Sequence, residues 1–187
     1  MKKLAFLCAL FLSGLSNAGT IYLDMDTNPT GQNLGNAPLI TSEGTITFLG
    51  AVSRSTDVDF EALGATGNNL DIASFGSGAS LRFNFDVTSF EFIFGGNSGQ
   101  FDMVAKNIFN NTVDSFFQAS TGSGEFAGPV TLSGVGIRSI SWNDPAGGFA
   151  AIDNVTITAA QVSESTSIAL LGLGLIGLYF GRRKDFT

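Results

Sequence analysis

Apolar side chains, most of them phenylalanine, recur at every second position in the middle of this chain, and this period constrains the fold more than any other sequence feature. The positions are Leu81, Phe83 and Phe85, then Phe90, Phe92 and Phe94, and then Phe101, Met103 and Ala105. Successive side chains of a β-strand point to opposite faces of a sheet. The period therefore predicts three strands that each bury one face, with residues 86–89 as a short connection between the first two.

Turn signals separate these strands from other short apolar runs. Residues 95–99 read Gly-Gly-Asn-Ser-Gly and residues 121–124 read Thr-Gly-Ser-Gly, and both compositions favour turns. Strands at such spacing, without a helical period between them, predict an all-β fold: a single antiparallel β-sandwich, jelly-roll-like, over residues 19–161. Further strands are predicted at residues 45–49, 113–118, 129–132, 136–142 and 151–158.

The phenylalanine rows have two interpretations, because an aromatic row serves either as a core or as a surface on which a ligand stacks. Alternation of apolar and polar side chains is what a sandwich core requires, so we favour the core. In the last predicted strand both faces carry apolar groups. Ile152, Asn154, Thr156 and Thr158 would share one face, with Val155 and Ile157 on the other.

The first eighteen residues have the three parts of a secretory signal peptide. Lys2 and Lys3 precede an apolar run over residues 4–12, and Ser16-Asn17-Ala18 places small residues at the cleavage positions. Cleavage is predicted between Ala18 and Gly19; an uncleaved anchor or a buried strand is the alternative. The single cysteine, Cys8, lies inside this leader, so the mature protein would have no disulfide and no thiol nucleophile.

A second apolar run lies near the other end of the chain. Residues 168–180 carry no charge, and Arg182, Arg183 and Lys184 follow them. A transmembrane helix is predicted at residues 167–181, shorter than the roughly 20 residues that ordinarily span a bilayer. The basic cluster at residues 182–184 would hold the end of the chain on the cytoplasmic side. A C-terminal core helix is the alternative.

The last 26 residues resemble the PEP-CTERM sorting signal in their three ordered parts: a short motif, a Leu/Gly-rich helix and a basic cluster. Val162-Ser163-Glu164-Ser165 matches the family's Val-Pro-Glu-Pro motif at Val162 and Glu164, whereas serines replace both prolines. The resemblance covers residues 162–187 and implies processing by exosortase, a membrane-embedded protease of Gram-negative bacteria. It also implies a precursor anchored in the inner membrane, delivered to the cell surface or the extracellular matrix.

Two later segments are similar to a β-sandwich domain that often precedes such tails. They are residues 137–140, Ile-Arg-Ser-Ile, and residues 151–155, Ala-Ile-Asp-Asn-Val. Domains of that kind are similar in plan to jelly-roll carbohydrate-binding modules, so this similarity implies extracellular polysaccharide as a partner.

Charge and composition exclude several classes of function. The chain has 9 basic and 16 acidic residues and no histidine. Nucleic acid is a poor partner, because binding to phosphates requires clustered cations. Without histidine the chain lacks the usual zinc ligand and the usual general base at neutral pH. It also contains neither a Gly-x-Ser-x-Gly elbow nor a phosphate-binding loop ending in lysine.

Alternating carboxylates at Asp57, Asp59 and Glu61 are a candidate calcium site, since calcium binds carboxylate and carbonyl oxygens. A solvated strand face explains them equally well, and we expect no other cofactor. Paired carboxylates are also used by glycoside hydrolases, the least favoured alternative here.

Trp142 beside Asn143 and Asp144 is the best local candidate for sugar binding. The ring would stack on a pyranose while the amide and carboxylate bind its hydroxyls; burial of Trp142 in the core is the favoured alternative. We therefore expect an exported, non-catalytic envelope protein with a structural or adhesive role, and a carbohydrate-binding module is the second hypothesis.

Overall fold

The computed structural model describes residues 18–23, 25–26, 32–35, 38–55, 67–72, 78–97, 100–119, 125–143 and 149–161. Gly19–Ala160 forms one compact unit. Residues 1–17 and 162–187 lie outside the described ranges, so the leader and the sorting tail stay predictions. Within the described ranges, no helix is long and apolar enough to cross a membrane.

The described residues form strands and turns, which confirms the prediction of an antiparallel all-β fold. The strands that pair in register are all antiparallel. In chain order they are β1 (Thr20–Leu23), β2 (Leu39–Ile40), β3 (Thr45–Leu49), β4 (Ala51–Ser55), β5 (Asn68–Ile72), β6 (Gly78–Asn97), β7 (Phe101–Asn107), β8 (Thr112–Gln118), β9 (Glu125–Asn143) and β10 (Phe149–Ala159).

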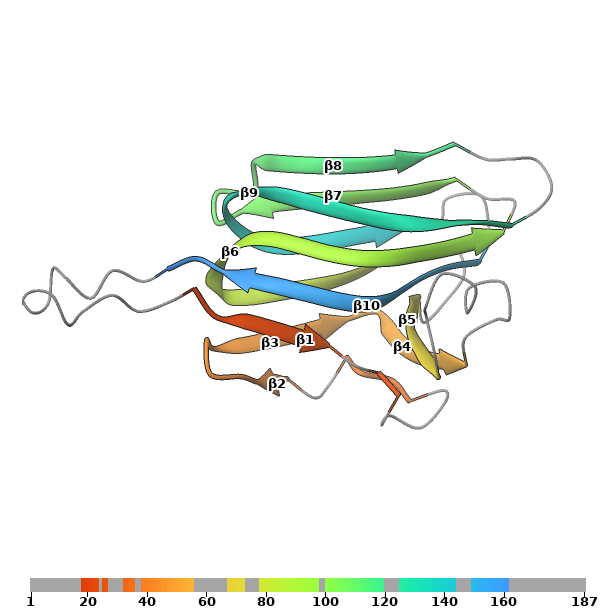
Figure 1. Ribbon diagram of the computed structural model, residues 1–187, viewed down its shortest axis with the longest axis horizontal. Coiled ribbons are helices and arrows are strands. Elements are labelled where there is room, and N and C mark those ends of the chain that lie inside the picture. Colours follow the sequence, from red (N-terminus) through yellow and green to blue (C-terminus); the bar gives the residue numbers. More distant parts are fainter. Residues whose placement is uncertain are drawn as a thin grey trace, which may run out of the picture. The chain divides into compact units, whose positions relative to one another are not determined.

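Two long strands fold the sheet into two layers. β6 has 20 residues and β9 has 19, and each passes from one layer to the other. The first half of β6 pairs with β3 on one side and with the second half of β9 on the other. The second half of β9 also pairs with β7, and β7 pairs with β8. We call these strands together the β7 layer. The second half of β6 pairs with the first half of β9 and with β10, and β1, β4 and β5 complete the β10 layer. Both long strands turn over at the same end of the unit (Figure 1).

The predicted phenylalanine rows are buried between these layers. Phe83 in the first half of β6 lies 6.4 Å from Phe90 in its second half, measured between ring centroids. Phe94 lies 5.3 Å from Phe101 on β7 and 4.9 Å from Phe116 on β8. Because each of these pairs joins the two layers, the rows form the core that the alternation predicted, and the fold is β-sandwich-like.

Three details of the predicted strands are wrong. Residues 86–89 do not connect two strands; they are the part of β6 where its register with β9 shifts. The runs at residues 129–132 and 136–142 likewise belong to one strand, β9. In β10 the register shifts after Asp153, and Asn154 has a φ of 49°, so Ile152 joins Val155 and Ile157 in the core. A β-bulge of this kind inserts one residue and reverses the alternation that follows.

Candidate functional site on the outer face of the β7 layer

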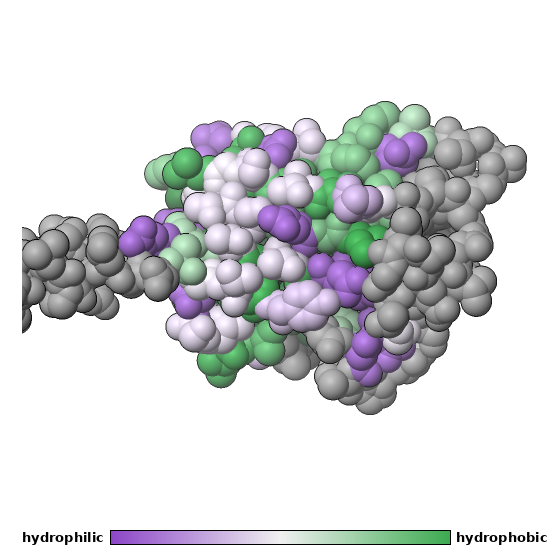
Figure 2. Space-filling view, viewed as in Figure 1, coloured by the Kyte–Doolittle hydropathy of each residue, from purple (hydrophilic) through white to green (hydrophobic). Residues whose placement is uncertain are grey.

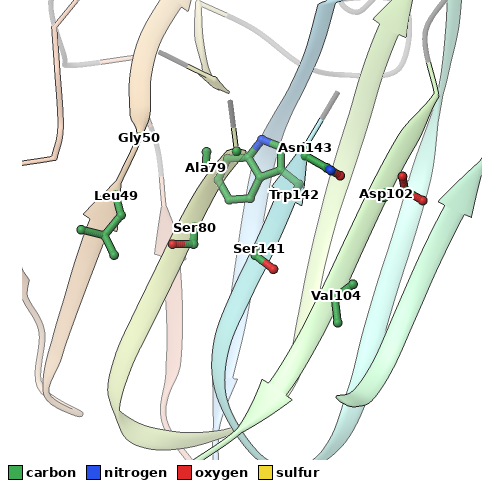
Figure 3. Close-up of a pocket in the computed structure, with 10 residues that line it drawn as sticks. Leu49, Gly50, Ala79, Ser80, Asp102, Val104, Ser141, Trp142 and Asn143 are labelled. Atoms are coloured by element: carbon green, nitrogen blue, oxygen red, sulfur yellow. The ribbon is translucent and has the colours of Figure 1, made fainter. Parts of the chain in front are cut away.

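A shallow depression of about 470 Å³ lies on the outer face of the β7 layer. Ser80, Ser141 and Val104 form one row across β6, β9 and β7, and Asn143 and Asp102 form the next row. These side chains point outward because they alternate with buried neighbours such as Leu81, Ile140 and Met103. Figure 3 shows the two rows side by side.

The lining of the depression is rich in groups that bind hydroxyls. Ser80 and Ser141 carry hydroxyls, Asn143 an amide and Asp102 a carboxylate. Gln100 donates a hydrogen bond from Nε2 to Oδ2 of Asp102 at 2.7 Å, which holds the carboxylate in place. This set combines hydrogen-bond donors and acceptors in a shallow, open depression, and such a set can bind a ligand rich in hydroxyls.

Asp102 is the one carboxylate among the described residues that line the depression. Glycoside hydrolysis needs two carboxyl groups on opposite sides of the bond that breaks. The described lining of the depression supplies one of these two groups.

Trp142 lines the depression but does not offer its ring face to a ligand. The side chain is 2% exposed, and Figure 3 shows its indole beside Ala79. Its Nε1 has no hydrogen-bond partner in the part of the chain described here. Burial agrees with the core alternative for Trp142, whereas Asn143 is exposed on the outer face. Asp144, the third residue of the predicted sugar site, lies outside the described residues.

Phe117 supplies an exposed aromatic ring that the sequence analysis did not single out. It lies opposite Asp102 in the β7–β8 ladder and is 58% exposed. A signal for it was present: Phe116 and Phe117 are adjacent in one strand, so only one of the two can face the core. Phe116 takes the inward position and packs on Phe94, which leaves Phe117 on the outer face beside the depression.

Two basic side chains flank Ser139 on the same outer face. Arg82 pairs in register with Ser139 from one side and Lys106 from the other. Strands lie about 4.8 Å apart, so the two Cα atoms are roughly 10 Å apart. Neither has an ion-pair partner among the described residues, whereas Arg138 binds Asp86, with Nε and Oδ1 2.6 Å apart. Two of the described cations of this acidic chain, Arg82 and Lys106, thus lie one row from the depression.

A buried polar group in the β10 layer was also missed by the sequence analysis. Asn69, Asp71 and Asp153 are all at most 4% exposed. The register pairs Asp71 with Ala151, which places Asn69 and Asp153 at neighbouring positions. The Asn69 amide has no hydrogen-bond partner among the described residues. The described ranges hold no group of three or more histidine, cysteine or acidic residues able to bind a metal.

The remaining predicted sites fall mostly outside the described residues. Asp57, Asp59 and Glu61, the candidate calcium ligands, are among them, as are residues 162–165 and 182–184 of the sorting tail. The two residues at the predicted leader cleavage are described: Ala18 is exposed, and Gly19 O accepts a hydrogen bond from Ala159 N at 2.8 Å. Cleavage, processing and calcium binding stay predictions.

Comparisons with known proteins identify the fold. No family model matches the chain, and no curated protein matches it. Among solved structures, the K2 cleaved adhesin domain of Lys-gingipain is 11% identical with a TM-score of 0.51, and the match covers 76% of this chain and 99% of that one. A family 29 carbohydrate-binding module complexed with mannohexaose is 15% identical with a TM-score of 0.42, covering 76% and 93%. The first likeness shows a shared fold.

Proposed function

We propose that this chain is an exported, non-catalytic protein of the cell envelope whose β-sandwich binds polysaccharide on the outer face of the β7 layer. The observation that carries the proposal is the depression with Asp102 and Asn143 in one row and the exposed ring of Phe117 beside them. An aromatic ring packs against the apolar face of a pyranose, while carboxylate and amide groups bind its hydroxyls. Binding without turnover would give the domain an adhesive role.

The charges on this face favour an acidic polysaccharide over a neutral one. Arg82 and Lys106 flank Ser139 without a described ion-pair partner, and both lie one row from Ser80 and Val104. Two neighbouring cations bind the carboxylates of a uronic acid chain by charge-assisted hydrogen bonds, which are stronger than bonds to neutral hydroxyls. The proposed ligand is therefore a chain of uronic acid residues.

Export and sorting form the second part of the proposal, and its support is the sequence. The leader at residues 1–18 would direct export, and the apolar run at residues 168–180 with its basic cluster would hold a precursor in the inner membrane. An exosortase-type protease would then act near residues 162–165. Mass spectrometry of the mature protein tests this part, and an intact Thr187 on most of the protein would contradict it.

Retention of the full-length protein, in mild detergent, on columns of immobilised alginate and of neutral galactomannan tests the binding face. We expect retention on alginate, and we expect Phe117→Ser to weaken it roughly three- to tenfold, as loss of about 1 kcal/mol implies. Tyr22→Ser and Glu91→Gln are the matched controls, because both residues are exposed in the β10 layer.

The double variant Arg82→Gln, Lys106→Gln separates the two ligand classes. It should abolish the preference for alginate while leaving the fold intact, and binding should fall as salt is raised. Equal weakening by the control variants, or no retention on either column, would contradict the proposed binding face.

A further inference from the structure

Three exposed apolar side chains form what we call the apolar tip: Ile108, Phe109 and Val135. They are 68%, 80% and 90% exposed, and only Ile40 among the other large hydrophobic residues described is as exposed. Ile108 and Phe109 belong to the turn between β7 and β8, and Val135 lies where β9 passes between layers. Figure 2 shows hydrophobic surface at this end, over the turns of β7, β8 and β9. Soluble surfaces seldom gather such side chains without a binding partner.

The turn that carries Ile108 and Phe109 is held by hydrogen bonds, so their exposure is built into the fold. Asn107 Oδ1 accepts from the backbone N–H groups of Phe109 and Asn111, each at 3.0 Å. Asn107 N–H donates to Asn111 O at 3.0 Å, and Asn110 adopts a φ of 64°. These hydrogen bonds of Asn107 fix the backbone of the turn, and the Ile108 and Phe109 side chains are exposed to solvent.

The second part of the tip lies against the same turn. Gly134 and Gly136, with φ values of 153° and 73°, flank Val135. Gly134 lies against the Val113 side chain on β8, and Ser133 N–H donates to Asp114 Oδ2 at 2.8 Å. Ile108, Phe109 and Val135 therefore belong to one surface at the end where β9 turns over.

The folded unit begins and ends at this same end. Ala160 N–H donates to Asp86 O at 2.7 Å, and Asp86 binds Arg138 beside the β9 turn. Six residues, 162–167, separate Gln161 from the apolar run at residues 168–180. At no more than about 3.6 Å per residue, that linker spans at most about 25 Å. A bilayer that held residues 168–180 would therefore lie within about 25 Å of Gln161.

We infer that the apolar tip inserts into the interface of the lipid bilayer that anchors the chain, and so fixes the domain against the membrane while the tail is intact. The inference rests on the membrane anchoring proposed above. Charges beside the tip are balanced, because Arg138 pairs with Asp86 and Lys106 and Asp114 lie on the joined strands β7 and β8. Aromatic and aliphatic side chains favour the interface, so contact should need no anionic lipid.

The test uses full-length protein in proteoliposomes of zwitterionic phosphatidylcholine, with Cys8→Ser as background so that one cysteine at a time carries an environment-sensitive fluorophore. Phe109→Cys and Val135→Cys report on the tip. Phe117→Cys is the matched control, since Phe117 is an exposed phenylalanine at the other end of β8. Labels at positions 109 and 135 should shift to shorter emission wavelength and lose intensity when spin-labelled lipid is included, whereas the label at position 117 should do neither.

Three other outcomes would overturn the inference, and each identifies which step of it is wrong. If the protein floats with the liposomes but positions 109 and 135 behave like position 117, anchoring stands and the tip does not touch lipid. A blue shift without quenching would mean that the tip contacts protein instead. If the protein does not float with the liposomes, the anchoring itself is wrong, and the inference falls with it.

Discussion

Truncation of Phe90 to alanine tests whether the phenylalanine rows hold the two layers together. Phe90 is fully buried in β6, between Leu132 on β9 and Ile157 on β10 in the ladder. Its ring centroid lies 5.4 Å from that of Phe92 and 6.4 Å from that of Phe83, which belongs to the other layer. Phe90→Ala therefore removes contacts within one layer and between the two.

The expected loss of stability follows from this burial. A buried phenylalanine replaced by alanine ordinarily lowers the free energy of unfolding by about 3–5 kcal/mol, because apolar surface is lost from the core and a cavity remains. Because Phe90 also loses its contacts with two aromatic rings, we expect Phe90→Ala to lower the free energy of unfolding by about 4 kcal/mol or more. For a domain of this size that corresponds to a fall in Tm of roughly 10–20 °C.

Guanidinium unfolding of the purified full-length chain, followed by Trp142 fluorescence, measures the change. Trp142 is buried in the same core, so its emission reports on unfolding. Phe117→Ala is the control, because Phe117 is 58% exposed, and it should lower stability by less than about 1 kcal/mol. Similar losses for Phe90→Ala and Phe117→Ala would refute the assignment of the rows to the core.

Two further predictions concern the backbone and a buried amide. Gly136→Ala should lower stability by roughly 1–2 kcal/mol, because Gly136 has a φ of 73°, which is unfavourable for alanine. A steric clash would not contribute, since the added Cβ would lie 3.7 Å from Asp86 Oδ1, an ordinary contact. Gly128→Ala, whose Cβ would lie 3.6 Å from Phe94, should change stability little, and equal thermal shifts for the two variants would contradict the backbone argument. Asn69→Leu should raise Tm, since the buried amide has no hydrogen-bond partner among the described residues and costs about 1–3 kcal/mol; a lower Tm would show that the amide is bound.

Local alternation predicted much of the core because one buried face is a local property of a strand. Phe83 and Phe101 are buried where the period places them, and Arg82 between apolar neighbours is exposed. Each such assignment needs only the two-residue period and the apolar character of one set of side chains.

The bulges could not be predicted in the same way, because their positions depend on partner strands far away in the sequence. At residues 86–89 the register of β6 follows β9, more than forty residues later in the chain. Asn154 adopts a left-handed conformation so that β10 can pair with β6 and β1 together. The glycines at positions 134 and 136, which take positive φ values where β9 turns over, are a local feature of the sequence that permits such a turn.

The candidate site depends on cross-strand register to a greater degree than the core does. Ser80, Asp102 and Asn143 come from three strands, and none of them belongs to a motif. Sequence reasoning found Asn143 through its neighbour Trp142, although the ring of Trp142 faces inward. Adjacent polar side chains on an outer face are visible only once pairing is known.

The depression and the apolar tip lie toward opposite ends of the folded unit, with Arg82 and Lys106 between them. β6 begins at Gly78, beside the depression, and reaches the turn-over at Asp86, where Ala160 is bound. Eight residues of strand at about 3.3 Å each separate these points by roughly 26 Å. If the apolar tip rests on a bilayer, the depression is held about that distance above it, whereas Lys106, two residues before Ile108, lies nearer to the lipid headgroups. Because Phe109 and Phe117 lie near opposite ends of β8, loss of lipid contact and loss of polysaccharide binding should follow from different substitutions.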